Sequence, residues 1–266
     1  MTAVSVDELR RAWIAIEAGE FRAGTASARR RAMSATWEPK EPVIVVVGAT
    51  GRVGASTVAI ALATAANKDV RVVECSSTHR TGMMTASTSE LGVDDVGWRC
   101  GARDAIRIER PTTSFERPSE VPLPAPVACD LTIVDVGWDL TQLLSEDSWL
   151  ATVLGSAPLV LVGVATVPGL RSLDAALLLI GHREDTWCAV IGPPRRKWPR
   201  VLHLAATGVG ALDERGRLFT IPEDPGIALN GLTQDPLPAR LVSACQPIFD
   251  QASAYLKGIT SHDAHF

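Results

Sequence analysis

The stretch that decides the fold runs from Val43 to Ala63 and reads VIVVVGATGRVGASTVAIALA. Five consecutive residues of strand type lead into a glycine-spaced turn, and apolar residues at helical spacing follow the turn. This order predicts a buried strand, a phosphate-binding loop and a helix.

The glycines of the loop favour a phosphate ligand. Gly51 and Gly54 allow successive backbone N–H groups to point inward at the first turn of a helix, where the helix dipole favours an anion. Such loops usually carry Lys and then Ser or Thr after the last glycine, for the phosphates and Mg²⁺ respectively. Here Ala55 takes the lysine position, whereas Ser56 and Thr57 retain the hydroxyls. A glycine turn without any ligand is the alternative interpretation of the loop alone.

The loop resembles the deviant Walker A motif of the ParA/MinD-type ATPases, which reads Gly-Lys-Gly-Gly-Val-Gly-Lys-Thr-Thr. Aligned with that motif, residues 49–57 keep two glycines, the valine and both hydroxyls, but Thr50 and Ala55 replace the two lysines. Arg52 replaces a family glycine, and its planar guanidinium differs from the compact ammonium of lysine. The resemblance implies ATP or ADP with Mg²⁺ as ligand, held by Gly51, Arg52, Val53, Gly54, Ala55, Ser56 and Thr57.

A second informative stretch, from Asp130 to Asp139, reads DLTIVDVGWD. An apolar strand that ends in aspartate is how P-loop proteins place a carboxylate beside Mg²⁺-bound water. The ParA/MinD resemblance therefore implies Ser56 and Asp135 as the Mg²⁺ site and places Trp138 and Asp139 in its second switch segment. Glu74, near the end of the strand expected over 69–76, is a further candidate for the metal or water shell. A strand-end aspartate that merely caps local backbone is the alternative.

Composition bounds the function classes. The 266 residues are 46% hydrophobic, enough for one large α/β domain with a substantial core. A net charge of -4 gives no global attraction to nucleic acid or anionic lipid. The five widely spaced cysteines indicate reduced thiols in a cytoplasmic protein rather than a zinc or redox motif. Residues 148–170 carry no charge, but their glycines and prolines favour a buried strand over a membrane span.

Further apolar strands alternate with helical segments along the chain. This alternation predicts an α/β fold with a mostly parallel sheet covered by helices on both faces, and the resemblance implies the P-loop architecture of the ParA/MinD type. Residues 81–91 are expected to be helical, and residues 97–108 a strand or hairpin. The expected organisation is an N-terminal amphipathic helix and basic linker over 1–40, a P-loop domain over 41–258 and a polar tail over 259–266.

The N-terminal segment from Val6 to Ala23 is amphipathic. Leu9, Trp13 and Ile16 fall three or four positions apart, as on one face of a helix. The segment either packs on its own domain or docks a protein partner or second subunit. Its mixed acidic and basic residues disfavour a membrane-surface helix.

A basic cluster follows the strand expected over 188–191. Its cations surround Trp198 and are Arg195, Arg196, Lys197 and Arg200. The cluster binds DNA or another polyanion in one interpretation and is a solvated loop in the other. In the resembled family, basic residues in this half of the chain help some members bind DNA without sequence preference.

The resemblance implies a homodimeric protein that acts in bacterial DNA segregation, element transfer or positioning of a complex. The absence of both lysines predicts weak or lost ATP hydrolysis and leaves open whether the chain is an enzyme. A second hypothesis is a non-catalytic protein-interaction module, a pseudo-ATPase scaffold on the same fold. A kinase-like or synthetase-like enzyme is disfavoured because the sequence shows no clear group of catalytic residues besides the P-loop and Asp135.

Overall fold

The computed structural model describes residues 36–263, except for 77–79, 182 and 206. Within this part of the chain, nine strands form one sheet in the order β3-β4-β5-β2-β6-β1-β7-β8-β9. The strands are β1 (Val43–Gly48), β2 (Val70–Glu74), β3 (Ser89–Val93), β4 (Trp98–Arg103), β5 (Ile106–Pro111), β6 (Leu131–Val136), β7 (Leu159–Val164), β8 (Thr186–Ile191) and β9 (Leu218–Ile221). Every neighbouring pair from β5 to β9 is parallel, whereas β3, β4 and β5 pair antiparallel.

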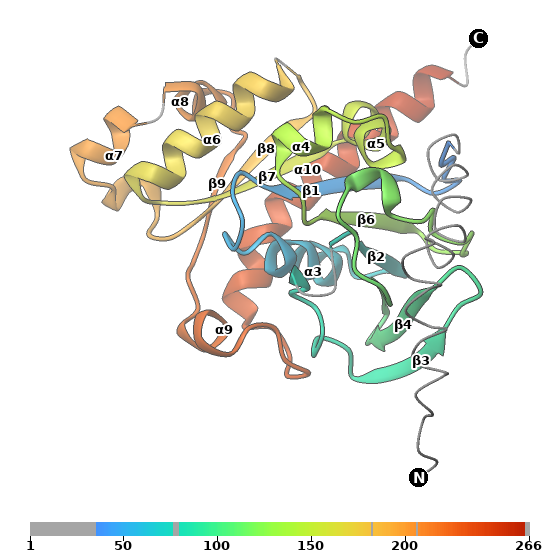
Figure 1. Cartoon of the computed structure of the whole chain (residues 1–266). Helices are drawn as coiled ribbons and strands as arrows, with labels where there is room; N and C mark the ends of the chain where they lie inside the picture. Colours follow the sequence, from blue (N-terminus) through green and yellow to red (C-terminus); the bar gives the residue numbers. More distant parts are fainter. Residues whose placement is uncertain (1–35, 77–79, 182, 206, 264–266) are drawn as a thin grey trace, which may run out of the picture.

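Helices cover both faces of this sheet (Figure 1). They are α3 (Ala55–Ala66), α4 (Leu140–Leu144), α5 (Trp149–Ser156), α6 (Val167–Ile180), α7 (Arg200–Ala205), α8 (Thr207–Glu214), α9 (Pro225–Asn230) and α10 (Ala239–Asp263), with short 3-10 turns η2 (Pro118–Glu120) and η3 (Arg195–Lys197). The predicted α/β architecture with a mostly parallel sheet is therefore confirmed.

The central strand β1 shows why the strands are continuous apolar runs. Side chains alternate between the two faces of a strand. Ile44 and Val46 belong to the core beneath α3 and α10, whereas Val45 and Val47 belong to the core beneath α4, α5 and α6. Both faces of β1 are thus buried, which requires apolar residues at consecutive positions.

Residues 81–91 do not form the expected helix. Ser89–Val93 is instead β3, an edge strand that pairs antiparallel with β4, and the Thr88 N–H donates to the Ala102 carbonyl just before it. The run of Ser and Thr in this segment is a weak helix former, so pairing with the free edge of β4 prevails. The hairpin expected over residues 97–108 is confirmed as β4 and β5.

The uncharged residues 148–170 are divided among one short helix, a buried strand and the start of a second helix. They contribute α5, β7 and the first turn of α6. No helix in the described part of the chain combines the length and the apolarity that crossing a bilayer requires.

A buried ion pair joins β2 to β5. Arg71 and Glu109 are 1% and 0% exposed, and Arg71 Nη2 lies 2.5 Å from Glu109 Oε2. The other carboxylate oxygen accepts from Arg107 Nε at 2.7 Å. Both oxygens of the buried Glu109 side chain are therefore compensated by guanidinium groups, as a buried charge requires.

Replacing Glu109 by leucine should destabilise the protein by about 3 to 5 kcal/mol, because Arg71 would remain buried without a compensating charge. Urea unfolding measures this difference in the free energy of unfolding. The double variant Arg71→Met with Glu109→Leu should recover most of the loss, since no uncompensated charge then remains inside. Equal stability of the single variant and the wild type would contradict the assignment of this pair as structural.

Candidate functional site

The loop between β1 and α3 turns tightly and needs glycine at two positions. Gly54 has a φ of 86°, and a Cβ there would lie 2.5 Å from Ile191 Cδ1. A Cβ on Gly48 would lie 2.6 Å from the Thr50 carbonyl oxygen. Gly51 sits at the exposed tip, where a Cβ would meet no described atom within 4 Å. Backbone curvature thus depends on Gly48 and Gly54.

The first turn of α3 presents free donor capacity to this loop. Its N-cap is Gly54, which supplies no side-chain hydrogen bond, and no acidic side chain lies in the first turn. The first N–H groups of a helix lack intrahelical partners and carry the positive end of the helix dipole. Ala55, Ser56 and Thr57, which begin α3, are half-buried. The arrangement suits an anion such as phosphate.

Arg52 is exposed and has a φ of 62°, in the left-handed region. Glycine adopts this conformation without steric cost, whereas other residues rarely do. A strained backbone at a ligand loop is typical of functional sites. The loop therefore holds a cation at a position where its conformation alone would favour glycine.

Two carboxylates lie side by side at the carboxyl ends of β2 and β6. Glu74 and Asp135 are register partners on these adjacent parallel strands and are 1% and 2% exposed. Ser56 Oγ, on α3, donates to Asp135 Oδ2 at 2.6 Å. Among the described residues, Asp135 Oδ1 is buried and has no hydrogen-bond partner. Asp135 therefore keeps one buried oxygen open for a ligand.

Glu74 holds the segment after β2 close to the loop. Its Oε1 accepts from the Gly82 N–H at 2.6 Å, and its Oε2 accepts from the Thr81 hydroxyl. A Cβ on Gly82 would lie 2.8 Å from Ser56 Oγ, so the backbone of Gly82 lies against that hydroxyl. Sequence analysis did not assign Thr81 and Gly82 to this site. Their only signal is a glycine that follows a strand ending in an acidic residue.

Burial governs the protonation of both acids. Burial raises the pKa of the Asp135 carboxyl from 3.8 to about 7, the Glu74 carboxylate acts in the same direction, and the hydrogen bond from Ser56 opposes it. Burial also raises the pKa of Glu74, opposed by the Thr81 hydroxyl and the Gly82 N–H. Ionisation of both groups is therefore less favourable than in water, and a bound cation would favour their ionised forms.

The residues present fit a bound Mg²⁺. A serine hydroxyl and a carboxylate with a free oxygen are the ligand types that this cation takes from P-loop proteins, together with water and phosphate oxygens. Within the described residues, no group of three or more His, Cys, Asp or Glu side chains is arranged around a metal position. Ser56 and Asp135 would thus need phosphate and water to complete a coordination shell.

The other acidic residues of the Asp130–Asp139 stretch lie elsewhere. Asp139 caps α4, because its Oδ1 accepts from the Thr141 and Gln142 N–H groups at 2.9 and 3.3 Å. Asp130 stands at the opposite end of β6 from Asp135 and accepts from the Asp69 N–H at 3.3 Å. The structure therefore brings only Asp135 of these three aspartates to Ser56.

The basic cluster follows β8 at the same edge of the sheet as the loop. Arg195 is held by Asp213 at 3.0 Å and lies over the Trp198 ring, with 5.6 Å from its Cζ to the ring centroid. The other cations are exposed, and they are Arg196, Lys197 and Arg200. The cluster is thus partly built into the fold and partly presented to solvent. Leu9, Trp13 and Ile16 lie outside the described residues.

Comparison with known proteins identifies the fold. A plasmid partition protein from Borrelia burgdorferi bound to AMPPNP matches with a TM-score of 0.51 and 15% sequence identity, over 80% of this chain and 99% of that chain. The ATP complex of an McdA variant from Cyanothece matches with a TM-score of 0.50 and 13% identity, over 83% of this chain and 98% of that chain. The chain has the ParA/MinD-type P-loop fold. No protein-family model and no curated protein sequence matches it.

Replacing Asp135 by asparagine should remove the contribution of this carboxyl to the pH dependence of stability in EDTA. The pKa of Asp135 is raised on folding, so the folded state binds more protons than the unfolded state and loses stability as pH rises from about 4 to about 7. Relative to the wild type, the variant should therefore gain about 1 to 3 kcal/mol of stability between pH 5 and pH 8. Urea unfolding at both pH values measures it.

Asp130→Asn is the matched control, because it changes an exposed carboxylate at the opposite end of β6. A loss of stability in Asp135→Asn at pH 8 as large as at pH 5 would contradict a buried, strained carboxylate at this position.

Proposed function

We propose that the chain binds ATP or ADP with Mg²⁺ at its P-loop and acts in bacterial DNA segregation, element transfer or positioning of a protein complex. The observation that carries this proposal is the Asp135 Oδ1 atom, which is buried and has no hydrogen-bond partner among the described residues. It lies beside Ser56 at the N-terminus of α3. The fold of a partition protein that binds AMPPNP and of an McdA variant that binds ATP supports it. The functional unit is the domain over 41–258, acting as a cytoplasmic homodimer.

Each part of the loop has a proposed role. The backbone N–H groups of residues 51–57 bind phosphate at the positive end of α3. Ser56 and Asp135 hold Mg²⁺, and Arg52 contributes a positive charge at the tip of the loop. Mg²⁺ bound there would neutralise phosphate charge. Glu74 and the Thr81–Gly82 segment keep the Ser56 hydroxyl and the Asp135 carboxylate in place.

Hydrolysis is proposed to be weak or lost. Thr50 and Ala55 stand where the resembled family has lysines, and neither has a cationic side chain that could pair with a phosphate. Losing such a contact with a buried partner costs about 2 to 5 kcal/mol. Arg52 lies at the exposed tip of the loop, whereas the missing lysine position, Ala55, is next to Ser56. The Arg52 guanidinium therefore replaces at most part of the positive charge of the two lysines.

A pseudo-ATPase scaffold is the second candidate function, and one observation favours it. The Ser56 hydroxyl is already bonded to Asp135, and the Gly82 backbone lies against it. Polar groups that satisfy one another in this way can stabilise the edge of the sheet without a nucleotide. In this case the fold would serve as a platform for partners.

Calorimetric titration with ATP and with ADP in Mg²⁺ distinguishes the two candidates. The nucleotide hypothesis predicts micromolar binding that requires Mg²⁺ and weakens about tenfold in Arg52→Ala, which removes a charge-assisted contact. Arg99→Ala, on the exposed side of β4, is the control and should bind as the wild type does. The absence of heat and of any thermal shift at millimolar nucleotide would favour the scaffold.

The basic cluster is proposed to bind DNA without sequence preference. Affinity for a random duplex should fall with salt, and the double variant Arg196→Glu with Lys197→Glu should reduce the magnitude of the log-log salt slope by about 2, one contact for each cation. Fluorescence anisotropy at several salt concentrations measures the slope, with Arg117→Glu as the control. Duplex binding that does not depend on salt, or that the double variant leaves unchanged, would contradict this assignment.

A further inference from the structure

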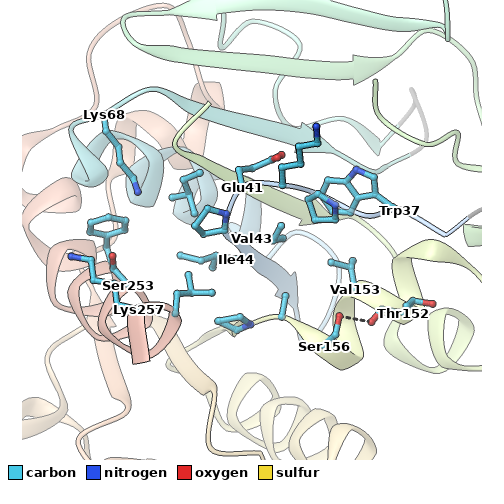
Figure 2. A pocket seen from close by; sticks show the side chains of 18 residues that line it. Trp37, Glu41, Val43, Ile44, Lys68, Thr152, Val153, Ser156, Ser253 and Lys257 are labelled. Carbon is cyan, nitrogen blue, oxygen red and sulfur yellow. Dashed lines mark hydrogen bonds between the residues drawn. The ribbon is translucent and has the colours of Figure 1, made fainter. Parts of the chain in front are cut away.

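A groove of about 520 Å³ lies at the opposite end of the sheet from the P-loop. It opens at the start of β1, between α5 and α10, and Figure 2 shows Val43 and Ile44 between Val153 of α5 and Ser253 of α10. The carboxyl end of β1 leads into the P-loop, whereas this groove lies at its amino end. The groove is therefore separate from the candidate nucleotide site.

The groove combines an apolar lining with a cationic rim. Half-buried Trp37, Phe249 and Leu256 line it above the buried start of β1. The lysines at its edge are Lys40, Lys68 and Lys257, and Glu41 is the one carboxylate among its described lining residues. Lys68 Nζ lies 5.6 Å from the centroid of the Phe249 ring. Such a surface suits an amphipathic segment that carries acidic residues beside its apolar face.

The chain itself arrives at this groove. Trp37 lines it and packs edge-on against Trp149 of α5, with 5.2 Å between ring centroids. The described part of the chain, which starts at residue 36, therefore begins at the mouth of the groove. The linker of residues 24–36, at about 3.3 Å per residue, reaches about 40 Å, enough to return any part of the preceding segment to the groove.

The sequence of the preceding segment complements the groove. Leu9, Trp13 and Ile16 share one face at helical spacing. Glu17 and Glu20 follow Trp13 and Ile16 by four positions, so a helix would place them next to that apolar face. Three apolar side chains thus match the lining, and two carboxylates match the lysines of the rim.

We propose that the groove between α5 and α10 binds the segment Val6–Ala23 of the same chain through Leu9, Trp13 and Ile16. This intramolecular contact covers the amino ends of β1 and β6 and leaves the P-loop edge free. It holds whether or not the chain binds nucleotide, because the two surfaces lie at opposite ends of the sheet.

Hydrogen exchange on the full-length protein tests the proposal with a matched pair of variants. Ser156 lines the groove, and Gly155 is its exposed neighbour on α5, where a Cβ would meet no described atom within 4 Å. Peptides from Val6–Ala23 should exchange at least about tenfold more slowly than free peptide in the wild type and in Gly155→Glu. This protection should disappear in Ser156→Glu, because the new carboxylate repels Glu17 and Glu20. Absence of protection in the wild type, or its persistence in Ser156→Glu, would overturn the proposal.

Disulfide trapping supplies an independent test that does not rely on Ser156→Glu remaining folded. The double variant Trp13→Cys with Ser156→Cys should form a bond within one chain upon mild oxidation, seen as a monomer of altered mobility on a non-reducing gel. Trp13→Cys with Gly155→Cys is the control and should form it at least about tenfold more slowly. A covalent dimer would instead identify the segment of a second copy as the occupant and would overturn the intramolecular assignment.

Discussion

The in-register pairing of parallel strands β2, β6 and β1 is the constraint on which the rest of the structure depends. Parallel strands align their carboxyl ends at one edge of a sheet and their amino ends at the other. Glu74 and Asp135 therefore face each other at the edge where β1 enters the P-loop. The groove between α5 and α10, which Val43 lines, forms at the opposite edge. One pairing pattern thus creates two separate surfaces.

The buried carboxylates Glu109 and Asp135 differ in how their negative charge is compensated. Glu109 is neutralised on both oxygens by arginines and contributes to the structure of β2 and β5. Asp135 has only a hydroxyl on one oxygen, no partner on the other among the described residues, and the Glu74 carboxylate beside it. A buried carboxylate without a compensating charge is unfavourable, and a bound ligand can offset this free-energy cost. Carboxylates with shifted pKa values therefore cluster at functional sites.

The P-loop conformation does not depend on the lysines that the chain lacks. The curvature depends on Gly48 and Gly54, and the loop is anchored by a buried strand before it and a buried helix after it. A lysine side chain contributes charge to a ligand rather than shape to the backbone. The P-loop backbone is therefore built by this chain's own glycines, although Thr50 and Ala55 stand where the resembled family has lysines.

The sequence by itself determined the elements whose signals are local. The run Val43–Val47 predicted a strand buried on both faces, the glycines after it predicted the tight loop, and the apolar strand before Asp135 predicted an acidic strand end, because each signal lies within one element. The resemblance implied a shared Mg²⁺ site at Ser56 and Asp135, and in the structure the Ser56 hydroxyl donates a hydrogen bond to Asp135.

Tertiary structure alone decided the elements that depend on distant partners. Residues 89–93 became a strand because the edge of β4 was available, and Gly82 came to lie against Ser56 because Glu74 binds its N–H. The groove likewise needs α5, α10 and the start of β1 together. Backbone hydrogen bonds and packing between residues far apart in sequence leave no periodic pattern along the chain, so sequence analysis could not detect them.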